Sequence, residues 1–197
     1  GLDAEGRFLA YEAHLLHDAG CTTDLSPAVL ERSLFHACNA YAIPNGRIEA
    51  VSCRTNLPTN TAFRGFGAPQ AIAVIEAAVR AAARDRGVPA TQLQRANLVR
   101  EGDVTHYGMR LRGVRAGDCW DALVARHDPE RLRKEAALYN AAHPLQRRGV
   151  DVVPVCFGIA FTARWLNQAE ALVHVYADGT IGVTTGAVDM GQGVHAK

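Results

Sequence analysis

The sequence lacks the features that would place it among membrane or nucleic-acid-binding proteins. Its 197 residues hold no apolar run near the roughly 20 residues that a membrane-spanning helix needs. Basic and acidic residues nearly balance, 21 against 20, and both signs are mixed along the chain. A nucleic-acid-binding surface needs a one-sided basic excess, so we expect no nucleic-acid partner and no membrane span.

Clustered cysteines and paired histidines are also lacking. The five cysteines are scattered without a C-x-x-C pair, which excludes the usual zinc and iron–sulfur spacings. The eight histidines form no H-E-x-x-H motif. Scattered cysteines of odd number are typical of reduced thiols, so we expect a cytoplasmic protein.

The composition is that of an ordinary globular protein. The sequence patterns predict both strands and helices, without internal repeats. Ser26-Pro27 is typical of a helix start, and Asp118 and Asp128 are expected to cap helices. Asp178-Gly179 is typical of a hairpin turn. The pattern predicts an α+β fold with mixed or antiparallel strands and segregated helices, not a doubly wound sheet. The expected strands are 7–15, 47–55, 151–162, 171–177 and 180–187, and the expected helices are 26–37, 69–86, 89–100, 119–126 and 129–142.

Both ends of the sequence look cut. The turn at Asp3–Gly6 follows only two residues, too few for the first strand of a hairpin. The last residues, "GQGVHAK", read as a glycine loop that opens a helix and then stops. We therefore expect a fragment of a longer protein.

The segment "TNTAFRGFGAPQA", residues 59–71, is the first candidate for chemistry. It puts Phe63, Arg64 and Phe66 on a glycine-hinged turn before a helix. Free N–H groups at a helix start favour an anion or an electron-rich oxygen, and an aromatic ring on a stiff loop can stack on a flat ligand. The alternative is a plain helix entry, with both phenylalanines buried and the arginine in a salt bridge.

A second candidate is "VDMGQGVHAK", residues 188–197. Gly191 and Gly193 flank Gln192, and backbone N–H groups together with the glutamine amide suit an oxygen-bearing cofactor. The spacing matches neither a Walker loop nor a dinucleotide fingerprint. A simple strand-to-helix turn is the alternative.

Two further candidates are weaker on pattern alone. Phe161 and Thr162 fall at the end of an apolar strand, where site residues often lie but core residues are more common. Arg32 lies inside a predicted helix beside Glu31, where a surface charge is the simpler interpretation.

Taken together, the segments resemble the molybdenum-cofactor-binding part of xanthine dehydrogenases, in the molybdenum hydroxylase family. "TNLPTNTAFRGFGAPQA" and "MGQGVHAK" match two specific cofactor-site motifs of that family. Four other stretches match in order and spacing: "ERSLFHACNAY", "NLVREGDVTHYG", "FGIAFTARWLNQA" and "VHVYADGTIGVTTG". The resemblance covers nearly the whole chain.

The resemblance assigns cofactor contacts to two loops. Gln192 is similar to the residue whose amide approaches the molybdenum oxo ligand and the pterin, and Gly191 offers backbone. Phe63 and Arg64 resemble the loop that packs against the cofactor ligands. The metal itself is held by the pterin dithiolene in this family, so no protein ligand to molybdenum is expected.

The resemblance also implies a flat substrate pocket. Phe66 is similar to the aromatic that lies face-on to the substrate ring, Phe161 to the one that meets it edge-on, and Thr162 to a hydroxyl that bonds a substrate polar atom. Arg32 resembles the catalytic arginine that stabilises negative charge on a purine carbonyl oxygen. Aldehyde oxidases, the nearest relatives, generally lack it, so Arg32 favours hypoxanthine and xanthine over the alternatives of an aldehyde oxidase-like hydroxylase or a non-catalytic piece. The departures "GAVD" and "GFGAPQ" from the family pattern are mild.

The rest of the enzyme is implied to lie elsewhere. The family's glutamate base and a second, purine-holding glutamate fall outside this sequence, so the 197 residues are expected to be inactive alone. The family's 2Fe-2S clusters, FAD and NAD belong to other domains or subunits. These, the remainder of the molybdenum-binding subunit and a dimeric assembly are the expected partners. Within residues 1–197 we expect one partial cofactor-binding domain, helix-rich to about residue 148 and β-rich from 149.

Overall fold

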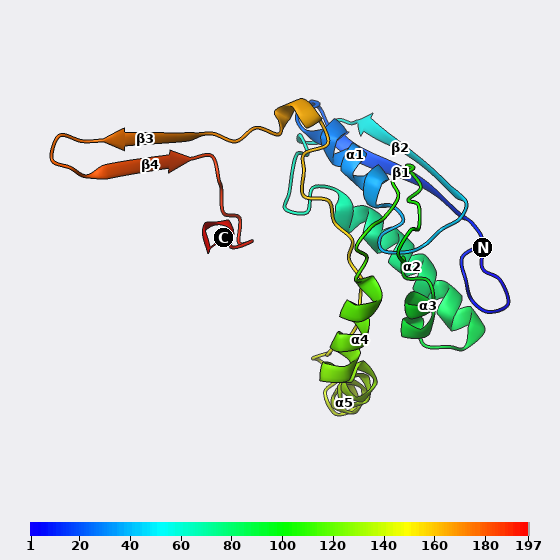
Figure 1. Ribbon diagram of the computed structural model, residues 1–197. Helices are drawn as coiled ribbons and strands as arrows, with labels where there is room; N and C mark the ends of the chain where they lie inside the picture. The colour runs from blue at the N-terminus through cyan, green and yellow to red at the C-terminus, as the bar shows by residue number, and fades with distance from the viewer. Residues whose placement is uncertain (197) are drawn as a thin grey trace. The chain divides into compact units, whose positions relative to one another are not determined.

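A strand, a helix and a second strand begin the fold, and they position the candidate loop. The computed structural model describes residues 1–196, which divide into two units, Gly1–Phe157 and Gly158 onward. In the first unit β1 (Tyr11–Gly20) and β2 (Gly46–Arg54) pair in parallel, with α1 (Ser26–His36) as the connection between them (Figure 1). Parallel strands need such a crossover, and the order strand, helix, strand agrees with the prediction from the sequence.

The first strand begins later than predicted. β1 covers Tyr11–Gly20 instead of residues 7–15, because the chain before it closes on itself as a turn. Leu2 and Phe8 form an antiparallel bridge, and Gly6 takes a φ of 81° that favours glycine. Along β1, Ala13 and Leu15 are buried and their neighbours are exposed, which is the expected alternation.

The longest helix follows the candidate loop. α2 (Ala68–Arg86) ends as predicted at Gly87, whose φ of 65° allows its N–H to bond the carbonyls of Ala83 and Arg84. A short helix, α3 (Ala90–Ala96), packs against α2. The α2 face that includes Ile75 and Val79 is buried, as the periodicity predicts.

Two more helices complete the first unit, and only one has the predicted cap. α5 (Pro129–Ala142) is capped by Asp128, whose side chain accepts a hydrogen bond from the N–H of Arg131. α4 (Ala116–His127) begins three residues before its predicted start, so Asp118 lies within its first turn and is not a cap. Asp118 instead pairs with Arg115. The predicted cap at Asp118 was wrong because the helix gains a turn before it.

The predicted strand over residues 151–162 is absent from the described structure. Residues 151–159 have no regular secondary structure. Their backbone is held by side chains instead: the N–H of Cys156 donates to Asn39, and the carbonyls of Val152 and Pro154 accept from Gln94 and Asn39. An apolar stretch whose backbone is already hydrogen-bonded to side chains has no need of a partner strand.

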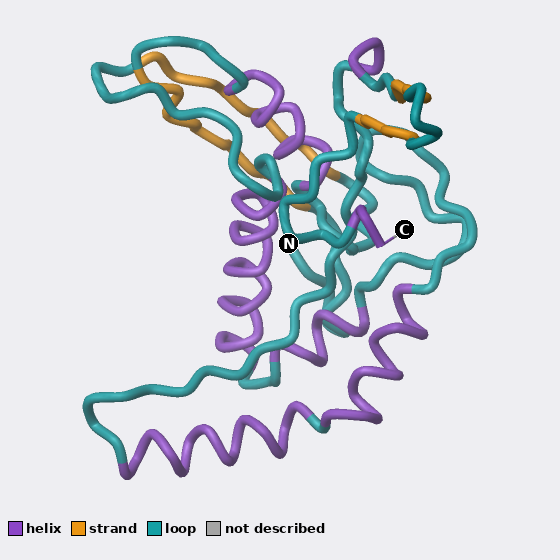
Figure 2. Tube along the Cα trace, turned by 90° about the vertical axis from the view of Figure 1, so that its left-hand side faces the viewer, coloured by secondary structure: helices purple, strands orange, loops and turns teal. Residues whose placement is uncertain are grey.

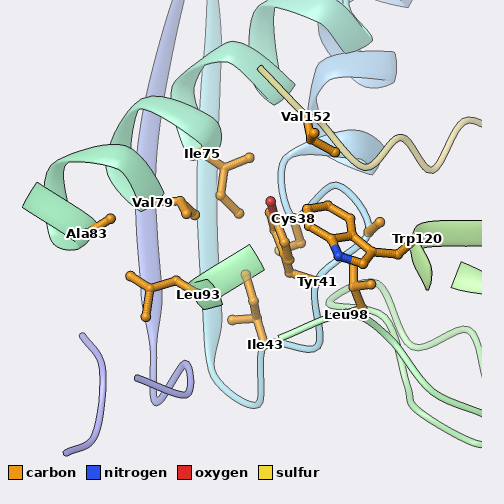
Figure 3. Close-up of a cluster of buried hydrophobic side chains, with 11 residues drawn as sticks. Cys38, Tyr41, Ile43, Ile75, Val79, Ala83, Leu93, Leu98, Trp120 and Val152 are labelled. Atoms are coloured by element: carbon orange, nitrogen blue, oxygen red, sulfur yellow. The ribbon is translucent and has the colours of Figure 1, made fainter. Parts of the chain in front are cut away.

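The main core of the first unit lies between α2, α3 and the segment after α1 (Figure 3). Burying each large apolar side chain contributes about 1.5–3 kcal/mol. A second, smaller cluster joins β1, α1 and α2 through Leu15, Ala37 and Ala71. The members of the main core are Cys38, Ala40, Tyr41, Ile43, Ile75, Val79, Ala83, Leu93, Leu98, Trp120 and Val152.

The second unit is built on the predicted hairpin. β3 (Ala171–Val175) and β4 (Ile181–Thr185) pair antiparallel, so the prediction from Asp178-Gly179 is confirmed. Gly179 has a φ of 84°, and the Asp178 carboxylate accepts from the N–H of Thr180 at 2.9 Å. Two 3₁₀ turns complete the unit, η1 (Arg164–Leu166) and η2 (Val194–Ala196).

The α+β class with mixed strands is therefore confirmed. Over residues 1–196, the five α-helices all lie before residue 143, and the strands form one parallel and one antiparallel pair. Figure 2 distinguishes helices, strands and loops along the chain by colour. In the described part of the chain, no helix is both long and apolar enough to cross a membrane.

Candidate functional site

The candidate loop in front of α2 has an unusual backbone. Gly65, Phe66 and Gly67 have φ values of 92°, 55° and 102° in succession. The middle residue is a bulky aromatic, for which a positive φ costs of order 1–3 kcal/mol. The N–H of Phe66 donates to the carbonyl of Phe63 at 2.8 Å, which closes the turn. Strain of this kind persists only where the surroundings fix it.

Helix α1 supplies those surroundings. The hydroxyl of Ser33, fully buried, donates to the carbonyl of Gly67 at 2.7 Å. A Cβ at Gly67 would lie 2.1 Å from the carbonyl oxygen of Val29, so only glycine permits this approach of the loop to α1. Arg32 and Phe66 are the residues next to this contact, and they therefore come from adjoining backbone.

Arg32 is buried, not a surface charge. Its exposed fraction is 6%, and its guanidinium carbon lies 5.3 Å from the centre of the Phe157 ring. Loss of water lowers the pKa of Arg32 from its ordinary value, but an arginine remains charged. The same Phe157 ring lies 5.0 Å from the imidazole of His36, one turn further along α1. The simpler interpretation of Arg32 as a solvated charge was wrong.

The other loop side chains differ in exposure. Phe63 is 83% exposed, so the alternative in which it is buried at the helix entry was wrong. Arg64 is exposed as well, and Phe66 is half-buried. Of the predicted site residues in the first unit, Arg32 and Phe66 are the sequence neighbours of the bonded pair Ser33 and Gly67, and Phe63 and Arg64 are exposed on the same loop.

Phe161 and Thr162 lie in a closed turn of the second unit. The Asn167 side chain accepts from the N–H of Phe161 and donates to its carbonyl, both at 2.8 Å. This pair of bonds fixes the backbone of Phe161. The hydroxyl of Thr162 is buried and finds no hydrogen-bond partner among residues 1–196. Buried hydroxyls are normally paired, so this oxygen has capacity for a further partner.

The glycine loop at residues 187–196 gathers backbone donors around one carboxylate. The N–H of Gly191 donates to Asp189 Oδ1 at 2.6 Å. Hydrogen bonds from the backbone of Gly191 first, and then of Gly193, His195 and Val194, lower the pKa of Asp189. Converging amide donors of this kind form a concave nest that suits an anionic or oxygen-rich group.

The side chain of Gln192 is engaged within the same loop. Its oxygen accepts from the N–H of Met190, and its amide nitrogen donates to the carbonyl of Val188 at 2.9 Å. A contact from Gln192 to a cofactor would exchange these bonds for new ones. Backbone N–H and amide donors are the groups that would suit the oxygen ligands of a molybdenum–pterin group, and in this structure they are bonded within the loop. The roles of Gly191 and Gln192 toward a cofactor stay predictions.

No metal cluster marks these residues in the described part of the chain. Over residues 1–196, no three His, Cys, Asp or Glu side chains lie close enough together to hold a metal ion. Of the larger cavities, one of about 490 Å³ lies between β1 and α1, beside His14, His17 and Asp18. Arg32 and Phe66 do not line it.

Sequence reasoning missed two residues that shape the surroundings of Arg32. Phe157 packs its ring on the guanidinium, and Ser33 fixes the loop to α1. A signal for Phe157 was present, since it precedes Phe161 by four residues in the same apolar stretch. Ser33 gave none, because a serine inside a helix has many roles.

Comparison with known proteins identifies the class. Profiles of the molybdopterin cofactor-binding domain match residues 1–98 and, with a second profile of the same description, residues 122–197. The chain belongs to the family of molybdopterin cofactor-binding domains. The resemblance read from its loops is therefore confirmed at the level of the family.

Its relatives are more specific. The chain is 43% identical to xanthine dehydrogenase/oxidase of Felis catus and 42% identical to xanthine dehydrogenase 1 of Arabidopsis thaliana, each over all 197 residues. It spans 15% of the first protein's length and 14% of the second's. The relatives are thus much longer than this chain, and further domains accompany the matching part in them.

A solved structure supports the fold. The aldehyde oxidoreductase of Desulfovibrio gigas superposes with a TM-score of 0.73 and 26% identity, over 92% of this chain and 19% of that one. Similar chains include a quinoline 2-oxidoreductase of Pseudomonas putida, with a TM-score of 0.59 over 71% of this chain and 19% of its own. At 24% identity this second likeness supports the fold alone.

Proposed function

We propose that this chain is part of a molybdopterin-dependent hydroxylase that oxidises purines, hypoxanthine and xanthine to urate. In that enzyme it supplies cofactor contacts and the walls of the substrate pocket. The relatives at 41–43% identity carry names of xanthine dehydrogenases, and every one is far longer than this chain. The activity belongs to the whole protein, and these residues are a contributing part of it.

One observation carries the purine assignment, the buried charge of Arg32. Its exposed fraction is 6%, and its neighbour in sequence, Ser33, donates a hydrogen bond to the backbone of the Phe66 loop. A charge in a water-poor site interacts more strongly than one at the surface. A purine develops negative charge on a carbonyl oxygen remote from the reacting carbon, and a fixed guanidinium stabilises that charge. An aldehyde develops none at that distance.

The other predicted residues take supporting roles in this proposal. Phe66 and Phe161 hold the flat substrate ring, and the Thr162 hydroxyl bonds one of its polar atoms. Phe63 and Arg64 border the cofactor, while Gly191 and Gln192 donate hydrogen bonds to it. When bound, the molybdenum–pterin group supplies the oxygen-transfer and electron-accepting chemistry.

Partners complete the enzyme. We infer that electrons leave through 2Fe-2S clusters and FAD to NAD on other domains or subunits. The remainder of the molybdenum-binding subunit supplies the glutamates, in a dimeric assembly. The five cysteines of this chain are all free thiols, which suits a cytoplasmic enzyme.

Substitution of Arg32 in the full-length enzyme tests the proposal. Arg32→Ala is expected to lower kcat/KM for xanthine by about 10²–10³-fold, the usual effect of removing one charge-stabilising group. Benzaldehyde oxidation should change far less, because it needs no remote positive charge. Steady-state kinetics on both substrates, with Arg131→Ala on the exposed face of α5 as a control, measure the difference. Equal losses on the two substrates would contradict the purine assignment.

An aldehyde-oxidising hydroxylase is the second candidate. The observation that favours it is the similarity to the aldehyde oxidoreductase of Desulfovibrio gigas, at a TM-score of 0.73. Strong preference of the wild-type enzyme for benzaldehyde over xanthine, unaffected by Arg32→Ala, would support this candidate instead.

A further inference from the structure

A carboxylate is buried in the first unit, away from the predicted site residues. Glu76 on α2 is 1% exposed, although a buried charge is costly unless donors satisfy it. Three neutral side chains donate to it: Tyr41 at 2.5 Å, Asn39 at 3.1 Å and Gln94 at 2.8 Å. Burial, and then the bond to Glu76, raise the pKa of the Tyr41 hydroxyl, so it stays a donor. We call these four residues the Glu76 network.

Two members of the Glu76 network also hold the extended segment 152–156. Asn39 donates to the carbonyl of Pro154 at 2.6 Å and accepts from the N–H of Cys156 at 3.2 Å. Gln94 donates to the carbonyl of Val152 at 2.8 Å. The network therefore forms hydrogen bonds with the backbone of every second residue of the segment. Glu76 fixes the orientation of both amides, because each donates to the carboxylate at the same time.

The segment that the network holds is followed by Phe157, the aromatic residue that packs on Arg32. Phe157 directly follows Cys156, and its ring centre lies 5.3 Å from the Arg32 guanidinium carbon. A ring over a cation both orients it and removes water from one face. The position of Phe157 thus depends on the backbone bonds that Asn39 makes one residue earlier.

We propose that the Glu76 network is a positioning device for substrate selection, which acts by holding Phe157 on the guanidinium of Arg32. The proposal rests on the proposed function, since Arg32 selects purines there. None of the network residues touches substrate; each acts through Phe157 and Arg32. If the ring is misplaced, the guanidinium of Arg32 becomes mobile and is hydrated. The value of kcat/KM should then fall more for a purine than for an aldehyde.

Asn39→Gly in the full-length enzyme is the sharpest test. Asn39 has a φ of 48°, which glycine accepts, so the change removes the amide without adding backbone strain. Asn140→Ala is the matched control, because Asn140 grips the backbone of Arg148 on both sides in the same manner, at the end of α5. Phe157→Leu removes the ring and leaves the network intact.

The expected results separate positioning from a structural role. Hydrogen exchange of residues 152–160 should become about tenfold faster in Asn39→Gly, while β1 and β2 keep their protection. The value of kcat/KM for xanthine should fall about 10- to 100-fold, with less than about threefold change for benzaldehyde. In an Arg32→Ala background, neither Asn39→Gly nor Phe157→Leu should lower kcat/KM for xanthine further, as expected for residues that act through one group.

Other results would overturn the proposal. These are unchanged exchange in Asn39→Gly, losses that add to those of Arg32→Ala, or equal losses on both substrates. If Asn39→Gly yields no folded protein, Phe157→Leu decides by the same substrate comparison. A wild-type enzyme without xanthine turnover would refute the proposed function separately. The exchange measurement would then still decide whether Asn39 holds the segment.

Discussion

At the residue scale, the sequence around Phe66 is determined by close approach of two backbones. Gly67 lies so near α1 that a Cβ would meet the carbonyl of Val29, and its φ of 102° is itself unfavourable for other residues. Gly87 at the end of α2 also has a positive φ, 65°, but nothing lies within 4 Å of its Cβ position. Substitution at Gly67 therefore meets both a steric contact and an unfavourable backbone conformation, whereas substitution at Gly87 meets only the conformation.

Gly67→Ala is expected to destabilise the protein by about 3 kcal/mol or more, since overpacking adds to the left-handed conformation. Gly87→Ala should cost only about 1 kcal/mol, for the conformation alone. Differences in thermal unfolding midpoint between the two variants and the wild type measure this. Equal midpoints for the variants would show that the loop simply moves away from α1.

His36 gives a pH dependence of known sign. Burial is the main cause that lowers its pKa below 6.5, and the charges of Arg32 and His106 lower it further. A lowered pKa means that the folded state resists protonation. The stability from neutral His36 is therefore present above about pH 6.5 and is lost as the pH falls through the folded-state pKa.

We expect unfolding midpoints to drop between pH 7 and 5, and to drop less in His36→Gln. The comparison needs the same buffer series for both proteins. An identical slope in the variant would mean that other groups, such as His17, whose pKa burial also lowers, dominate the acid sensitivity.

Residue roles were partly predictable. The glycines, the arginine and the aromatics of residues 63–67 stand out in the sequence because a plain turn does not need all of them. The burial of Arg32 could not be predicted, since it depends on Phe157 arriving from a distant part of the chain. Glu76 has a usable signal: a charge on the apolar face of a helix, next to Ile75 and three positions before Val79.

At the element scale, α4 and α5 show why a cap must be recognised by geometry. Both Asp118 and Asp128 precede an apolar helical pattern, yet only Asp128 accepts the N–H of Arg131. Aspartate is a suitable cap residue in both cases, but α4 begins three residues before its predicted start.

Asp128→Ala should therefore cost about 1 kcal/mol of α5 stability. Asp118→Ala should cost less than about 0.5 kcal/mol, because it removes only an exposed ion pair. Hydrogen exchange of the amides in the first turns of α4 and α5 measures both effects locally. Equal deprotection of the two helices would contradict the assignment of the cap.

The segment 151–162 was predicted as a strand because its residues are apolar and β-branched. Propensity describes side chains, whereas the pairing of a strand depends on which groups lie beside its backbone. Here those groups include Asn39 and Gln94, each more than 55 residues away in sequence. A local pattern contains no information about them.

At the scale of the whole chain, the two units differ in what stabilises them. Residues 1–157 hold both hydrophobic clusters. From residue 158 to 196 no side chain is fully buried, and Leu172 and Val183 in the hairpin are 66% and 63% exposed. A two-stranded hairpin without a core is marginally stable at best.

Residues 1–157, produced separately, should therefore unfold cooperatively on heating, whereas residues 158–197 should show no cooperative transition. Circular dichroism melts of the two pieces measure this, with the 197-residue chain as the reference. A sigmoidal melt from the smaller piece would contradict the expectation. The class of fold was predictable because periodicities and turn residues are local, whereas the parallel pairing of β1 and β2 depends on α1 packing across them.

The left-handed backbone at Phe66 also limits how the protein can be altered. In a library at position 66, glycine and asparagine would relieve the local strain and be enriched by any screen for thermostability. Both lack an aromatic face. If Phe66 stacks on a ligand as proposed, selection for thermostability and selection for ligand binding would therefore favour different residues at position 66.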